Sequence, residues 1–254
     1  MHSTILRSLL VCVCAVAFSA PAAEPNTPAA PAITRAVLAA TKLQTVVDAP
    51  VHFRAVSVTL PTGQSSRVSA SDGILYQLSG STAVSVGNDS KTLSPGEALY
   101  IANGSAANLK AGGSEPSTFL HFVLVVAADL NKPLEAAPAI GHELYRTEAP
   151  LPSLKPGRYD LTLSRVTFPA QMPTNAPHHR SGAALYYILS GTGANTIEGT
   201  PHNRAAGAVI YEPFGLVHQW GNPGEVPLVF LVFNINPEGV TAVVPGAPGK
   251  AGNP

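Results

Sequence analysis

Two short segments of the 254-residue chain carry the side chains best suited to chemistry. The first contains His178, His179 and Arg180, and the second contains Glu212 and His218. Imidazoles together with a carboxylate suit Fe, Mn, Ni or Zn. A guanidinium instead repels a divalent cation and binds carboxylates or phosphates through its five N–H donors. The residue types therefore predict either a metal site or an anion site, and both interpretations stay open.

The spacing of these residues indicates which side chains share a face. Side chains alternate between the two faces of a strand, so Trp220 should line the same cavity as His218. An ordinary core aromatic is the alternative for Trp220. By the same alternation Arg180 shares a face with His178 and not with His179, but the preceding proline blurs this geometry. Tyr186 lies two residues after Ala184 and is a further candidate for the cavity wall.

The segments around these residues are typical of β-structure. Short runs rich in Val, Ile, Tyr, Thr and Phe recur along the chain, and Gly, Pro and Asn interrupt them every eight to twelve residues. No long stretch has the 3.6-residue period of an amphipathic helix. Many short strands with regular turns favour an all-β sandwich or closed barrel.

The chain also repeats itself. The segment beginning at Tyr76 (YQLSG) aligns with the segment beginning at Tyr187 (YILSG), and Gly96 aligns with Gly207. These pairs, and several that follow them, are all 111 residues apart. A constant offset over this length indicates two copies of one domain.

Glu212 departs from the repeat. Its counterpart in the first copy is Ile101, so a carboxylate stands where the other copy has an aliphatic side chain. A buried carboxylate needs a partner or takes an elevated pKa. Three alternatives stay open: an ion pair with Arg180, a metal ligand, or a solvated residue at the end of a strand.

The composition and the first residues bound the class of protein. The formal net charge is +0 and 12% of the residues are charged, so the sequence offers no basic stripe for nucleic acid. An apolar run from Ile5 to Phe18, followed by small residues near Ala22, is typical of a secretory signal peptide. Both cysteines, Cys12 and Cys14, lie in that run, so the mature chain is expected to have no thiol.

The segment from Gly207 to Asn222 resembles the second sequence motif of the cupin superfamily, G-x5-P-x-G-x2-H-x3-N, at every specified position. The first cupin motif is present in part. Its closing glycine is Gly191 and its glutamate position holds Ala184. Its two histidine positions fall on His178 and Arg180, or on Pro177 and His179, depending on the spacing used.

The resemblance covers both copies and implies a bicupin, that is, two tandem antiparallel cupin (jelly-roll-type) β-barrels with a site inside a barrel. Metal-bearing cupins hold Fe, Mn, Ni, Cu or Zn with three histidines and one glutamate. The metal ligands implied here are His178 or His179 together with His218, with Glu212 in place of the missing glutamate. The first copy has none of the usual ligands at the equivalent positions, which are Arg67, Ser69, Gly73 and Ala107. A structural role is therefore expected for the N-terminal barrel.

These observations predict six segments. They are a signal peptide over 1–23, a Pro/Ala-rich linker over 24–40, an N-terminal barrel over 41–132, a connector over 133–155, a site-bearing C-terminal barrel over 156–240 and a disordered tail over 241–254.

Three hypotheses for function remain. In the first, one divalent metal (Fe, Mn, Ni or Zn) supports oxygenase, lyase or isomerase chemistry, with Glu212 and Tyr186 as catalytic candidates. In the second, a metal-free barrel binds a small molecule or anion through Arg180, with Trp220 and Tyr186 packed against its apolar part. In the third, both barrels are purely structural. The sequence does not decide whether the protein is an enzyme.

The expected partner is a small-molecule ligand, with no nucleic acid and no stable membrane span after cleavage. Dimerisation through barrel faces is common among cupins, so a homodimer is an open expectation. The signal peptide predicts a periplasmic or extracellular location.

Overall fold

The computed structural model describes residues 32–46, 50–68, 71–151 and 154–246. These residues form strands and one short 3-10 helix, η1 (Ala127–Asp129). Within the described ranges, no helix has the length and apolar character needed to cross a membrane. The predicted all-β class is confirmed.

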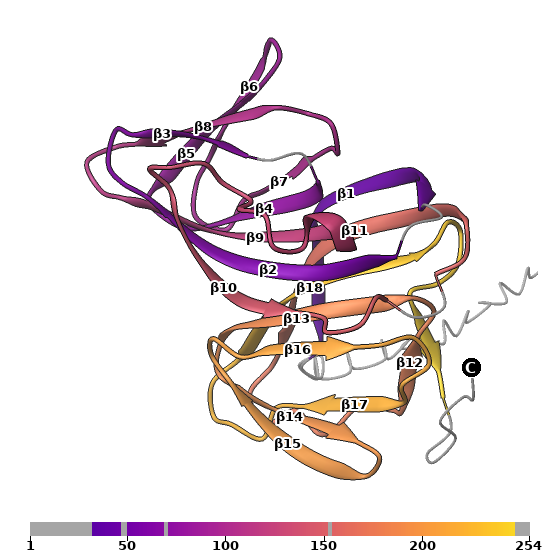
Figure 1. The fold of residues 1–254 in the computed structure, drawn as a ribbon. Coiled ribbons are helices and arrows are strands. Elements are labelled where there is room, and N and C mark those ends of the chain that lie inside the picture. The colour runs from indigo at the N-terminus through magenta and orange to yellow at the C-terminus, as the bar shows by residue number, and fades with distance from the viewer. Residues whose placement is uncertain (1–31, 47–49, 69–70, 152–153, 247–254) are drawn as a thin grey trace, which may run out of the picture. The chain divides into compact units, whose positions relative to one another are not determined.

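The first half of the chain forms two antiparallel sheets (Figure 1). One has the strand order β10-β2-β9-β4-β7 and the other the order β3-β8-β5-β6. The strands are β2 (Val51–Leu60), β3 (Ser65–Val68), β4 (Asp72–Ser79), β5 (Ser81–Val86), β6 (Asp89–Leu93), β7 (Ala98–Ile101), β8 (Ala107–Gly112), β9 (Ser117–Val126) and β10 (Ile140–Arg146).

The second half repeats this arrangement. Its sheets have the orders β1-β11-β18-β13-β16 and β15-β14-β17-β12-β19. The strands are β1 (Thr34–Val46), β11 (Gly157–Phe168), β12 (His178–Arg180), β13 (Ala183–Ser190), β14 (Thr192–Ile197), β15 (Thr200–Ala205), β16 (Val209–Glu212), β17 (His218–Gly221), β18 (Leu228–Pro237) and β19 (Val243–Pro245).

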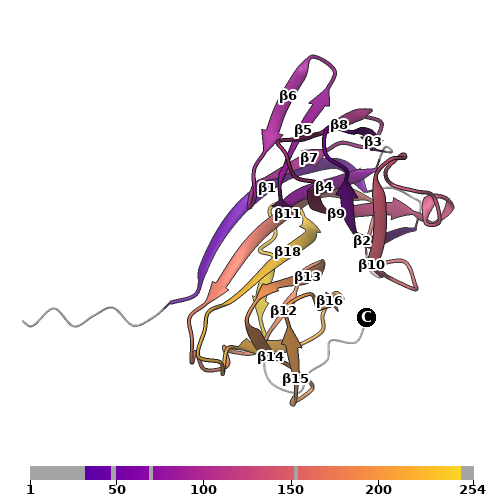
Figure 2. The ribbon, with the colours of Figure 1, turned by 90° about the vertical axis from the view of Figure 1, so that its left-hand side faces the viewer.

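The two halves exchange their first strands. β1 precedes the first half in sequence but pairs with β11 of the second, with Arg35 opposite Val166. β10 precedes the second half but pairs with β2 of the first, with Gly141 opposite Val58. Figures 1 and 2 both show the indigo β1 beside the later strand β11. Val58 pairs with Phe119 and Val166 pairs with Phe230, and these two phenylalanines are 111 residues apart, so β1 and β10 are equivalent strands.

The observed strand pairing corrects three predicted segments. The linker expected over 24–40 is wrong from Thr34 onward, because β1 begins there and its backbone pairs with β11. The connector expected over 133–155 contains β10, and the tail expected over 241–254 contains β19, which pairs with β12. Pairing with distant strands stabilises these segments, so their composition alone was misleading. The predicted signal peptide and residues 247–254 lie outside the described residues.

Three apolar clusters hold these sheets together. One fills the interior of the first half and includes Leu75, Leu109 and Val123. A second lies inside the other half and includes Trp220 and Phe230. The third joins the outer faces of the two five-stranded sheets, where Phe122 and Phe233 stack with ring centroids 5.7 Å apart. Burial at this junction contributes to the stability of both halves at once.

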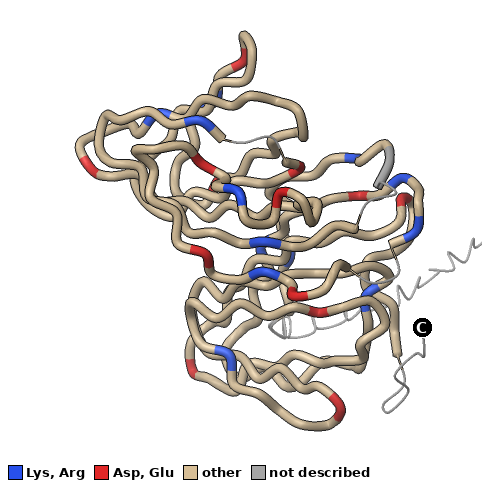
Figure 3. The backbone as a smooth tube through the Cα atoms, viewed as in Figure 1, with Lys and Arg blue, Asp and Glu red and all other residues tan. Residues whose placement is uncertain are grey.

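Charged side chains are sparse and of mixed sign along the described backbone (Figure 3). Arg180 and Glu212 are among the few charged side chains that are buried. These two residues mark the inside of the second half as the place where polar chemistry is concentrated.

Candidate ligand cavity in the C-terminal barrel

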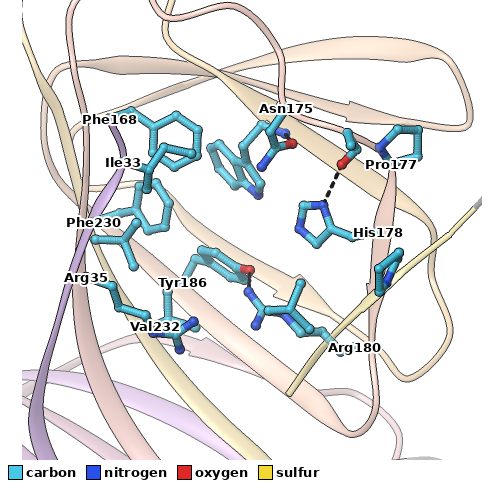
Figure 4. A pocket seen from close by; sticks show the side chains of 15 residues that line it. Ile33, Arg35, Phe168, Asn175, Pro177, His178, Arg180, Tyr186, Phe230 and Val232 are labelled. Carbon is cyan, nitrogen blue, oxygen red and sulfur yellow. Dashed lines mark hydrogen bonds between the residues drawn. The ribbon is translucent and has the colours of Figure 1, made fainter. Parts of the chain in front are cut away.

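A cavity of about 410 Å³ lies inside the second half. One wall is apolar and the other is polar: Figure 4 shows Ile33, Phe168 and Phe230 gathered on one side and His178 and Arg180 on the other. The remaining lining residues are Arg35, Val166, Asn175, Ala176, Pro177, Tyr186, Trp220, Val232, Val243 and Pro245. An apolar pocket with a few convergent polar groups is typical of small-molecule sites.

Strands β12 and β17 bring two histidines together. His178 pairs with His218 across these strands, and their ring centroids are 4.3 Å apart. His178 Nδ1 donates to the Ala176 carbonyl at 3.0 Å, and His218 Nδ1 donates to the Leu216 carbonyl at 2.9 Å. Nδ1 therefore carries a proton in both rings, and a neutral His178 keeps its lone pair on Nε2. Burial lowers the pKa of His178, which favours the neutral imidazole.

Glu212 lies opposite Ala184 and is completely buried. Its Oε1 accepts a hydrogen bond from Trp220 Nε1 at 2.9 Å, and its Oε2 accepts one from Arg180 Nε at 3.3 Å. His218 Nε2 lies 2.9 Å from the same Oε2, at ion-pair distance but without hydrogen-bond alignment. Burial alone would raise the pKa of Glu212, but His218 and Arg180 outweigh it and lower the pKa to about 2. Glu212 is therefore an anion with its lone pairs already engaged.

Arg180 is the buried cation of the site, with an exposed fraction of 3%. Besides its bond to Glu212, it donates from Nη2 to the Tyr186 hydroxyl, and its guanidinium carbon lies 5.3 Å from the centre of the Tyr186 ring. Its Nη1 is buried and has no hydrogen-bond partner among the described residues. A buried unpaired donor on a cation is costly unless a ligand or water accepts from it.

Three stacked aromatic rings, those of Tyr186, Trp220 and Phe230, also line the cavity. The Tyr186 and Trp220 rings stack 5.5 Å apart, and the Trp220 and Phe230 rings stack 5.2 Å apart. Burial raises the pKa of Tyr186, so its hydroxyl stays protonated. Tyr186 and Trp220 thus present flat apolar faces while their polar atoms contact Arg180 and Glu212.

The structure brings together His178, Arg180, Tyr186, Glu212, His218 and Trp220, all of which the sequence singled out. His179 is the exception. It lies between His178 and Arg180 on β12, and it does not line the cavity. Strand alternation is the reason, since His178 and Arg180 occupy the inward positions. The motif residue Asn222 is buried and donates to the Phe168, Pro169 and Val226 carbonyls, so it fixes a turn.

Sequence reasoning missed Arg35 and Asn175. Arg35 comes from the exchanged strand β1, which the sequence places far from the second half. Asn175 Oδ1 accepts a hydrogen bond from the Trp220 backbone N–H at 2.9 Å, which holds β17 against the preceding loop. No sequence signal identified Arg35, because the strand pairing that places it spans most of the chain.

The metal ligands implied by the cupin resemblance do not fit a metal in this arrangement. The free Nε2 atoms of His178 and His218 are compatible with ligation, and they are the only favourable feature of the described site. Glu212 is already bound by Trp220 and Arg180, and the buried guanidinium would repel a divalent cation. In the described part of the chain, no three His, Cys, Asp or Glu side chains are placed to hold an ion.

Comparison with known proteins supports the fold. The family model described as "Cupin domain" matches residues 164–234, which include the cavity strands β12 to β17. No curated protein matches the chain in sequence.

Solved structures match over most of the chain. A variant of oxalate decarboxylase from Bacillus subtilis is 17% identical with a TM-score of 0.56, covering 78% of this chain and 71% of that one. Another structure of that enzyme, whose title describes its Mn(II) centres, is 16% identical with a TM-score of 0.54, covering 81% and 74%. A variant of salicylate 1,2-dioxygenase from Pseudoaminobacter salicylatoxidans is 11% identical with a TM-score of 0.50, covering 76% and 77%. The chain therefore has the fold of tandem cupin-type β-barrels, and its residues 164–234 match the family model of the cupin domain.

Proposed function

We propose that the C-terminal barrel binds a small anionic molecule without a metal and that Arg180 is the residue that holds it. The observation that carries this proposal is the unpartnered Nη1 of Arg180, a buried cation that lines a cavity of about 410 Å³. Charge-assisted hydrogen bonds to a guanidinium are among the stronger polar contacts in proteins.

The ion pair between Arg180 and Glu212 supports the metal-free form of the proposal. Glu212 accepts from Nε of the guanidinium and Tyr186 accepts from Nη2, which leaves Nη1 available to a ligand. The metal hypothesis would instead require Glu212 to leave Arg180 and Trp220. Oxygenase, lyase or isomerase chemistry through a metal is therefore the less favoured function.

Metal content and ligand binding test the proposal together. The full chain is expressed with Fe, Mn, Ni and Zn supplied, and bound metal is measured by mass spectrometry in the wild type and in His218→Ala. We expect far less than one metal per chain in both. Near-stoichiometric metal in the wild type that is lost in His218→Ala would overturn the metal-free form.

Binding is followed through the fluorescence of Trp220, the single tryptophan of the chain, which lines the cavity. Chelator-treated protein is titrated with acetate, succinate, phosphate and hexanoate. The matched variant carries Arg180→Met and Glu212→Gln together, because removing both charges leaves neither one buried alone. We expect at least one anion to quench the wild type and to bind the double variant about tenfold more weakly or worse. Equal affinity in both proteins would contradict the role of Arg180.

A further inference from the structure

Arg35 is a second guanidinium at the same cavity, and it arrives on the exchanged strand. Its strand partner is Val166, and both residues line the cavity wall. Burial and the charge of Arg180 lower the pKa of Arg35, which places the two cations in each other's field. Among the described residues, no hydrogen bond or ion pair neutralises Arg35. The equivalent position in the first half holds Gly141, so this cation belongs to the C-terminal barrel alone.

The charges of the cavity do not cancel without a ligand. Glu212 is an anion that accepts a hydrogen bond from Arg180 Nε, so its charge offsets that of Arg180. Arg35, which lines the cavity and is exposed to solvent, then remains without a carboxylate partner among the described residues. An anionic group on the ligand is the missing counterpart, and an acceptor for Nη1 of Arg180 is supplied by the same group.

Arg35 lines both this cavity and a neighbouring hollow. On one side is the apolar wall of Ile33, Phe168 and Phe230. On the other is a hollow of about 500 Å³ with a mixed lining, in which Lys42, Asp160, Thr162, Ser164 and Asn236 lie beside Val37, Ala40 and Ala242. The Ser164 hydroxyl there is buried and has no partner among the described residues. A ligand is thus oriented with its apolar body against the aromatic wall and its charged end toward Arg35.

We infer that the ligand is a carboxylic acid with an apolar body, gripped by Arg35 of β1 and Arg180 of β12. This inference rests on the proposed metal-free anion site and adds the chemical class of ligand and a second binding residue. A carboxylate matches the planar donor fork of arginine. The body of the acid packs on the stacked rings of Tyr186, Trp220 and Phe230.

Hexanoate, hexanamide and acetate test this class directly. Hexanamide keeps the apolar body without the charge, and acetate keeps the charge without the body. With Trp220 fluorescence as the readout, wild type should bind hexanoate at least about tenfold more tightly than either analogue. Equal binding of hexanoate and hexanamide would overturn the requirement for a carboxylate. Equal binding of hexanoate and acetate would overturn the requirement for an apolar body.

The variant Arg35→Met tests the second guanidinium. It should weaken hexanoate about tenfold and leave hexanamide unchanged, because the methionine keeps the length of the side chain. Lys42→Met is the matched control, since Lys42 lies on the same strand but bonds to Glu238 outside the apolar cavity. If Arg35→Met leaves hexanoate affinity intact while the double variant at Arg180 and Glu212 loses it, this inference fails and the proposed anion site stands. If no anion binds the wild type, the proposed function itself fails.

Discussion

The two barrels share one strand arrangement but differ in the residues that face their interiors. Where the C-terminal barrel has Glu212, His218 and Trp220, the N-terminal barrel has Ile101, Ala107 and Leu109 at the equivalent positions. Those three apolar residues are at most 1% exposed and belong to the core of the first half. The C-terminal positions instead form a charged cluster beside a cavity. A few inward-facing residues therefore decide whether such a barrel is a packed core or a binding site.

The N-terminal barrel is not wholly apolar. His121 Nδ1 lies 2.5 Å from Glu135 Oε1, and both side chains are buried. This pair does not correspond to the His218–Glu212 pair, because the counterpart of His121 in the second half is Val232. Each barrel thus buries a carboxylate beside an imidazole, but among the described residues only the C-terminal pair is joined by a buried arginine that lines a cavity.

The largest expected effect in this comparison comes from Glu212→Ala. It leaves the buried guanidinium of Arg180 without its carboxylate, so urea denaturation should show a loss of about 3–5 kcal/mol in the free energy of unfolding. The double change to Arg180→Met and Glu212→Gln should cost much less. The exposed ion pairs of Glu238 provide the control, and Glu238→Ala should leave the unfolding midpoint close to that of the wild type. Equal losses for the single and double variants would contradict the ion-pair account.

A smaller effect is expected from exchanging the residues that the two barrels hold at one equivalent position. Gly73→Ala places a methyl 2.6 Å from Val123 Cγ1, 2.8 Å from His121 Nε2 and 2.9 Å from the Phe122 carbonyl oxygen. Overpacking of this kind should lower the free energy of unfolding by about 1–3 kcal/mol. The reciprocal change Ala184→Gly should cost about 0.5–1 kcal/mol. A neutral Gly73→Ala would show that the first barrel has room that its packing does not suggest.

A further effect is expected in the dependence of stability on acid pH. Because the pKa of Glu212 falls from 4.5 to about 2 on folding, its ionisation stabilises the protein above pH 4.5, and that contribution is lost as the pH falls toward 2. Protonation of His178, whose pKa is also lowered, weakens the fold in the same direction near and below pH 6.5. Thermal unfolding across this range should give a shallower loss below pH 4.5 in Glu212→Gln than in the wild type. If stability falls in parallel with pH in the two proteins, Glu212 does not contribute to the pH dependence.

The sequence predicted the β-class and the shared face of His218 and Trp220, because both follow from local alternation and from the repeat, but it left open which of His178 and His179 faces inward. His218 and Trp220 lie on one side of β17 and contact the same carboxylate, as their spacing indicated. The sequence could not choose among the three alternatives for Glu212, since its contact with Arg180 depends on how β12 and β16 approach in space. Arg35 was missed for the same physical reason. Its position depends on the pairing of β1 with β11, and no local pattern encodes a partner so distant in the chain.

The exchange of first strands also governs how the protein is assembled during translation. β1 leaves the ribosome first, but the strand that pairs with it, β11, follows only after the whole N-terminal barrel. The N-terminal sheet likewise waits for β10 before its own edge is complete. Contacts between segments so far apart in sequence close large loops, which slows folding and leaves unpaired strand edges exposed in the meantime. Neither half can finish alone, so a chain that stops between them would carry one strand with no partner and one sheet open at its edge.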